Sequence, residues 1–224
     1  MIITSICKKN TDKKDANVKR GDICYAYDIY IDNSYAFSVT EEDYFKLNLY
    51  DKKEITEEEL NILKKVTDFS IAKTRALTYL SYKIRTAKEI ENKLLKEGFN
   101  SDIISKVIKD LVSDGYINDM LYVRKYIYDR NKLNPKSKRM LAYELKNKGI
   151  DDDLINEGLS ELKIDNILIA KDLVLKKYKE LDVSDAKVKR KIFLFLKYRG
   201  FTDNEIKNVI NEIADEITDD MENY

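Results

Sequence analysis

The sequence contains no histidine, and it has only one proline, two cysteines and six glycines among 224 residues. Without histidine, the chain lacks the usual general base, the commonest metal ligand and every Ser/His or Cys/His nucleophilic pair. No phosphate-binding loop of the GxxxxGK[ST] or GxGxxG type occurs, and two cysteines cannot supply two zinc-binding pairs. We therefore expect a protein that is not an enzyme and that uses no cofactor and no metal.

No apolar run approaches the roughly 20 residues that a membrane-spanning helix needs, and the charges of residues 8 and 9 come too early for a secretory signal. Two cysteines imply no disulfide framework, which favours a reducing, cytoplasmic location. Cys7 and Cys24 are expected as buried free thiols, with neighbouring positions on paired strands as the alternative. The scarcity of proline and glycine favours long helices.

The formal net charge of zero hides an uneven distribution. Residues 1–72 carry 11 Lys and Arg against 14 Asp and Glu, and residues 151–224 carry 12 against 18. Residues 73–150 carry 18 against 9, so a basic block lies between two acidic ones. Such a block predicts a surface for phosphates or for an acidic protein, although any single lysine in it is better explained as a solvated side chain.

The chain repeats one plan three times with a period of 51 residues. The recurring sets are Gly98, Gly149 and Gly200; Leu94, Leu145 and Leu196; and Lys88, Arg139 and Arg190. Each glycine suits the left-handed position after a helix, and the apolar residue that follows can pack back on that helix. Asn100, Asp151 and Thr202 then suit the N-cap of a second helix. A period near 50 residues is typical of stacked units of supersecondary structure.

The first 70 residues alternate in the manner of strands before they become helical. Strands are predicted over residues 1–8 and 23–31, and a third carries Tyr35, Phe37 and Val39 on one apolar face. Asp32 and Asn33 tolerate positive φ and can form the two-residue hairpin turn between the second and third strands. Short helices are expected over residues 40–49 and from Thr56, which forms a capping box with Glu59.

The rest of the chain is predicted as helices. Their expected ranges are about 71–82, 86–98, 101–114, 119–131, 137–148, 152–162, 165–180, 186–199 and 203–217, with an acidic tail after them. The fold class is therefore mainly α: three tandem three-helix repeats in an elongated array, preceded by a small β-rich α+β module. The domain boundaries predicted from the pattern are 1–70 for the β-rich module and 71–117, 118–163 and 164–224 for the helical repeats.

Basic residues precede the same helix of each repeat, so stacking would place them along one edge. The candidate contacts for a polymeric, negatively charged partner are Arg75, Lys83, Arg85, Lys88, Arg124, Lys125, Arg130, Lys136, Lys138, Arg139, Lys189 and Arg190. Basic helix starts oppose the helix dipole, which suggests that they serve binding. Tyr79, Tyr82, Tyr122 and Tyr126 fall at helical spacing, and core packing explains them better than base stacking does.

Several segments resemble the RecX family of recombination regulators, in the Gram-positive type with an N-terminal β-rich extension. The opening motif of that family is similar to residues 76–82 and 85–90 together with Leu94 and residues 96–99. A second motif is similar to residues 115–119 with Tyr122, Tyr126 and Arg130, and a third to Leu145 with residues 148–150. The strand at residues 34–39 also fits that type, so the resemblance covers nearly the whole chain.

The resemblance implies a small cytoplasmic, monomeric protein of DNA repair, recombination and the SOS response. Such a protein binds the RecA recombinase and its filament on single-stranded DNA, restrains ATP hydrolysis and strand exchange, and in several members binds single-stranded or double-stranded DNA directly. No membrane contact is implied. Two alternatives stay open: a sequence-tolerant DNA-binding protein whose helix-turn-helix-like units act without RecA, and a helical-repeat scaffold for protein interactions.

Overall fold

The computed structural model describes residues 1–8, 27–161, 165–178 and 185–222, with the side chains of the last range as far as Glu216. The chain forms two compact units, residues 1–118 and 119–224. Three predictions fall outside the described residues: the domain boundary at residue 163, the state of Cys24 and the part of the second strand before residue 27.

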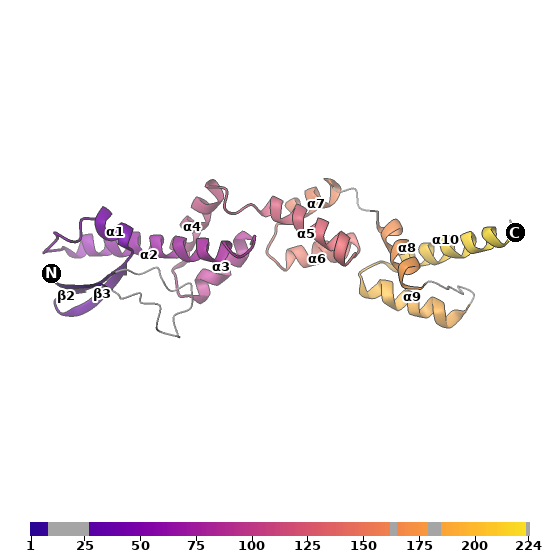
Figure 1. Ribbon diagram of the computed structural model, residues 1–224, viewed down its shortest axis with the longest axis horizontal. Coiled ribbons are helices and arrows are strands. Elements are labelled where there is room, and N and C mark those ends of the chain that lie inside the picture. The colour runs from indigo at the N-terminus through magenta and orange to yellow at the C-terminus, as the bar shows by residue number, and fades with distance from the viewer. Residues whose placement is uncertain (9–26, 162–164, 179–184, 223–224) are drawn as a thin grey trace. The chain divides into compact units, whose positions relative to one another are not determined.

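The first unit begins with a three-stranded antiparallel sheet of order β1 (Ile3–Lys8), β2 (Tyr27–Ile31) and β3 (Ser34–Val39). Asp32 and Asn33 form the predicted hairpin turn, with φ of 47° and 64°. The sheet packs against the N-terminal half of α2 (Glu57–Leu80) (Figure 1). Ile29, Val39 and Leu63 are buried together in the core between them.

Two predictions for the sheet are wrong. Tyr35 does not share the buried face of Phe37 and Val39, because its side chain is 58% exposed. The pairing of β2 with β3 shifts register at Ile29 and Tyr30, and such a bulge reverses the direction in which the next side chain points. Cys7, which pairs with Asp28 on the neighbouring strand, is an exposed free thiol rather than a buried one.

Helix α2 is one continuous helix of 24 residues, whereas the sequence predicts a helix from Thr56 and a separate one near residue 71. The predicted capping box begins it: the Glu59 N–H donates to the Thr56 hydroxyl at 3.1 Å, and a Glu59 carboxylate oxygen accepts from the Thr56 N–H at 3.0 Å. Neither proline nor glycine interrupts the helix, and its two halves serve different cores. Residue 70, the predicted module boundary, therefore lies inside α2.

Each helical repeat has its own buried core. In the first unit, the C-terminal half of α2 packs with α3 (Ala87–Lys96) and α4 (Ser101–Ser113). In the second unit, α5 (Asp119–Leu133), α6 (Lys138–Lys146) and α7 (Asp152–Glu161) form one core. The core after it belongs to α8 (Asn166–Lys177), α9 (Ala186–Tyr198) and α10 (Asp203–Glu222). The predicted plan of three-helix repeats is thus confirmed.

The corners between the second and third helices follow the predicted glycine rule. Gly98, Gly149 and Gly200 have φ of 89°, 77° and 89°. After α3, the Phe99 N–H donates to the Leu94 carbonyl at 3.2 Å and the Gly98 N–H to the Leu95 carbonyl at 3.0 Å, and the same pattern closes α6 and α9. These corners fix where the next helix begins, and they recur because the local sequence recurs.

The predicted end of the last helix is wrong, because α10 continues past Ile217 to Glu222. Residues 218–222 contain no glycine or proline that would stop a helix. None of the helices that the structure describes is long and apolar enough to cross a membrane.

Candidate functional site

Four of the predicted contact residues lie in the first unit: Arg75, Lys83, Arg85 and Lys88. Arg75 is half-buried on α2, and Lys83 is exposed in the loop after it. The Arg85 guanidinium lies 4.0 Å from the centre of the Tyr79 ring, so Arg85 packs against the helix that precedes it. Lys88, at the start of α3, forms an ion pair of 2.8 Å with Glu91.

The second unit places some predicted contacts in internal ion pairs. Both Arg124 nitrogens that face Glu161 donate to its carboxylate at 2.7 Å, which joins α5 to α7. Hydrogen bonding to Glu161 raises the pKa of Arg124, and hydrogen bonding from Arg124 lowers the pKa of Glu161. Lys125 lies 4.0 Å from Asp129 on its own helix. These cations are largely cancelled within the fold.

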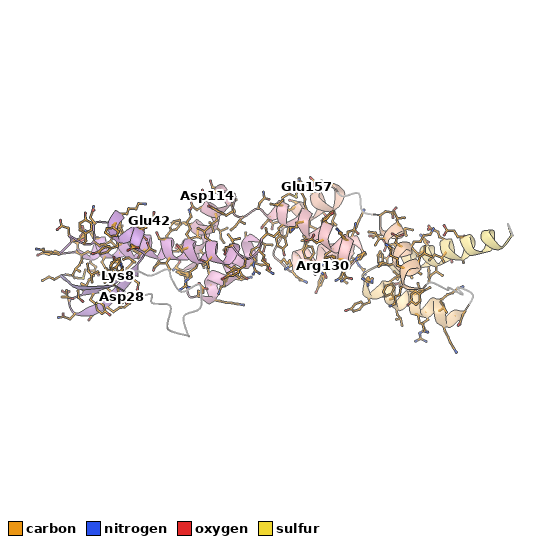
Figure 2. All side chains as sticks on the ribbon, in the orientation of Figure 1. Lys8, Asp28, Glu42, Asp114, Arg130 and Glu157 are labelled. Atoms are coloured by element: carbon orange, nitrogen blue, oxygen red, sulfur yellow. The ribbon has the colours of Figure 1, made fainter. Side chains whose placement is uncertain are left out.

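Glu144 of α6 gathers three further groups. The Tyr126 hydroxyl donates to Glu144 Oε2 at 2.8 Å, Lys136 forms an ion pair with Glu144 Oε1, and Arg130 lies 3.6 Å from Oε2. Figure 2 labels Arg130 on the second unit. Arg130 also donates to the Tyr126 hydroxyl at 3.1 Å. Arg130 and Lys136, both predicted as partner contacts, therefore hold α6 against α5 and the loop between them.

We expect Glu144→Gln to destabilise the second unit by about 1–3 kcal/mol at neutral pH, because the charged acceptor is lost. Burial alone would raise the pKa of Glu144, but hydrogen bonds from Lys136 and Tyr126, with the charges of Lys136 and Arg130, outweigh it and lower that pKa. A folded-state pKa below the unfolded one stabilises the fold above the unfolded value, near 4.3, and this contribution disappears as the pH falls through the folded value.

Urea denaturation at pH 7 and at pH 3 should therefore show a gap between wild type and E144Q that narrows in acid. Glu212→Gln, at an exposed position of α10, is the matched control and should change little at either pH. If the stability difference between wild type and E144Q is the same at pH 7 and at pH 3, the ionised Glu144 carboxylate does not stabilise the fold.

The remaining predicted contact residues are more accessible to a binding partner than those held in ion pairs. Lys138 and Arg139 occupy the start of α6, and Lys189 and Arg190 occupy the same places in α9, 51 residues later. All four side chains are exposed, and within the described ranges none has an ion-pair partner within 4 Å. The cations best placed for a partner are therefore at the starts of the middle helices of the second and third repeats.

Sequence reasoning missed the junction between these two repeats. Arg199 Nη1 donates to Asn134 Oδ1 at 2.5 Å and to the Pro135 carbonyl at 3.1 Å, while the Ser137 N–H donates to the Arg199 carbonyl at 3.2 Å. The Lys138 N–H also donates to Asn166 Oδ1 at 2.9 Å. No local sequence pattern predicts these contacts, because the partners are at least 28 residues apart in the sequence.

The described residues offer no cluster of three or more His, Cys, Asp or Glu that could hold a metal ion. Tandem three-helix domains with cationic helix starts define a class of helical-repeat protein. Two family models agree with this description: the first three-helix domain of RecX matches residues 72–111, and the second three-helix domain of RecX matches residues 118–159.

Curated relatives and solved structures extend the match. Regulatory protein RecX of Clostridium acetobutylicum is 33% identical over 194 residues, covering 84% of this chain and 90% of that protein. Regulatory protein RecX of Bacillus subtilis is 32% identical over 221 residues, covering 97% and 80%. The crystal structure of a regulatory protein RecX, 23% identical, has the same fold with a TM-score of 0.64 over 94% of this chain and 98% of that one.

The crystal structure of RecX from Lactobacillus salivarius is 29% identical and has a TM-score of 0.55, covering 66% of this chain and 97% of that one. The chain belongs to the RecX family of regulatory proteins.

Proposed function

We propose that this protein binds the RecA recombinase and its filament on single-stranded DNA and restrains ATP hydrolysis and strand exchange. Similarity to regulatory RecX proteins along nearly the whole chain carries this proposal. The exposed cations at the starts of α6 and α9 support it, because a repeated positive charge suits a polymer of repeated negative charge. We also propose a cytoplasmic, monomeric protein whose action needs no chemistry of its own.

The charge of the third helix in the second and third repeats argues against DNA reading by helix-turn-helix units. In such units the second helix of the motif lies in the major groove, between two rows of phosphates. Here α7 carries Asp152, Asp153, Glu157 and Glu161 and no Lys or Arg. Helix α10 carries eight Asp and Glu against Lys207 alone. Inserted into a major groove, both helices would have phosphates on two sides and would be repelled, so RecA remains the better primary partner and contact with DNA falls to the cationic starts of α6 and α9.

The direct test is the rate of ATP hydrolysis by RecA on a long single-stranded DNA, with this protein added up to the RecA concentration. We expect the rate to fall severalfold. An unchanged rate at equimolar protein rejects the proposal.

A plain DNA-binding protein could also lower the rate by removing DNA from RecA. A large excess of the same single-stranded DNA distinguishes the two cases. Inhibition that persists in excess DNA supports binding to RecA, whereas full recovery favours the DNA-binding alternative. A protein scaffold without either activity would leave the rate unchanged in both conditions.

A further inference from the structure

A shallow groove between the middle and last helices recurs in the first two helical repeats. Between α6 and α7 it has a volume of about 370 Å³ and is lined by Lys138, Arg139, Ala142, Asn156, Leu159 and Ser160. Between α3 and α4 it has a volume of about 360 Å³, and its lining includes Glu91, Ser105, Ile108 and Lys109. At the 51-residue period these last four correspond to Ala142, Asn156, Leu159 and Ser160. The two grooves are therefore equivalent places in two copies of one unit.

The two grooves differ in charge at several positions of the repeat, and the first groove, lined by Glu91 and Lys109, carries one charge of each sign. In the first repeat, Glu91 lies three residues after Lys88 and pairs with it at 2.8 Å, so the cation is cancelled within its own helix. In the second repeat, Arg139 replaces Lys88 and Ala142 replaces Glu91. Lys138 adds a second cation where the first repeat has Ala87. The lining of the α6–α7 groove thus contains two cations and no carboxylate.

The carboxylates nearest to Arg139 on α10 are already engaged. Asp203 forms an ion pair with Lys197, whose hydrogen bond is the main cause of the lowered pKa of Asp203, and Arg139 contributes to that shift less strongly. Glu205 accepts hydrogen bonds from Thr202 and from Asn166. Arg139 therefore interacts with Asp203 and Glu205 only through long-range charge attraction, and its guanidinium donors stay exposed to solvent.

We propose that the α6–α7 groove binds the phosphates of a single-stranded nucleic acid and that the α3–α4 groove does not. Lys138 and Arg139 contact phosphate oxygens, since a guanidinium and an adjacent ammonium suit successive groups of a charged chain. The Asn156 amide supplies a neutral donor, and Ala142 and Leu159 form an apolar floor for the sugars. This inference rests on the proposed function and deepens it, because it states which of the first two repeats contacts the DNA.

The test uses the full chain and a fluorescein-labelled oligothymidylate, with affinity measured by anisotropy at several salt concentrations and without RecA. Ala142→Glu gives Arg139 the internal partner that Lys88 has, and we expect about a fivefold loss of affinity at 0.1 M salt. Lys138→Gln with Arg139→Gln should lower affinity by about 25-fold and reduce the salt slope by about 1.4, since each phosphate contact on a single strand contributes about 0.7.

The first repeat supplies matched controls. Lys88→Gln, at the place equivalent to Arg139, should leave affinity unchanged because that lysine is already paired. Glu91→Ala should release Lys88 and raise affinity severalfold. If circular dichroism shows that A142E does not fold, E91A and K138Q/R139Q test the proposal instead. Higher affinity of E91A together with lower affinity of K138Q/R139Q supports the proposal, and unchanged affinity of both variants overturns it.

Equal losses for K88Q and K138Q/R139Q would overturn the assignment to the second repeat. Displacement of the oligothymidylate by poly-L-glutamate at equal charge concentration would assign the groove to an acidic protein surface and also overturn the proposal. The RecA ATPase assay separates the two levels. Wild-type inhibition with unchanged oligonucleotide affinity in K138Q/R139Q rejects the groove alone, and affinity losses without any wild-type inhibition reject the proposed function alone.

Discussion

Gly200→Ala is expected to destabilise the second unit by about 2–5 kcal/mol. Part of this cost, about 1–2 kcal/mol, comes from placing a side chain at a φ of 89°. The rest, about 1–3 kcal/mol, comes from overpacking, because the new Cβ would lie 2.6 Å from Met140 Cβ and 2.7 Å from Ser137 Oγ. A Cβ atom cannot rotate away, so α6 itself would have to move.

Gly98→Ala is the matched control, since Gly98 also has a φ of 89° but a Cβ there would meet no atom within 4 Å. It should cost only the backbone strain of about 1–2 kcal/mol. Amide hydrogen exchange in each unit measures both values, because the two glycines belong to different compact units. Equal costs would mean that the close approach of the α9–α10 corner to α6 does not contribute.

Removing the positive charge at the start of α9 is expected to have the largest effect on DNA affinity. The variant replaces four exposed side chains with glutamine: Lys187, Lys189, Arg190 and Lys191. If each contacts a phosphate, affinity for a single strand should fall on the order of 100-fold or more at 0.1 M salt, and the salt slope should decrease by up to about 2.8.

The control must remove the same charge from a different surface. Glutamine at four lysines of the first unit does so: Lys46, Lys53, Lys64 and Lys65. A purely long-range effect of net charge would weaken binding equally in both variants. A loss confined to the α9 variant supports a contact surface there, and equal losses would contradict it.

Much of the fold could be predicted because its signals are local. The glycine corners, the Thr56 capping box and the Asp32–Asn33 turn each depend on residues a few positions apart. The errors arose where distant contacts decide. The β2–β3 bulge exposes Tyr35. The sequence pattern predicts two helices where the structure has α2 alone, whose two halves pack into different cores.

The candidate site was harder to predict for the same reason. Arg124 and Glu161 are 37 residues apart, so their pairing becomes visible only in three dimensions. Lys88 and Arg139 occupy one position of the repeat, yet the residue three places later decides whether each is cancelled. That difference was readable from the sequence. That four cations at the starts of α6 and α9 meet the partner, and that they form one row with those of the first unit, stays a prediction.

Because α2 spans residues 57–80 without a break, the sheet and the first helical repeat both pack against the same helix. A protein shortened to begin at residue 71 would lose 14 residues of that helix together with its capped start. Division after residue 118 leaves whole every helix that the structure describes. Any dissection of this protein, whether by a protease, by gene fusion or by evolution, should therefore separate it at that point.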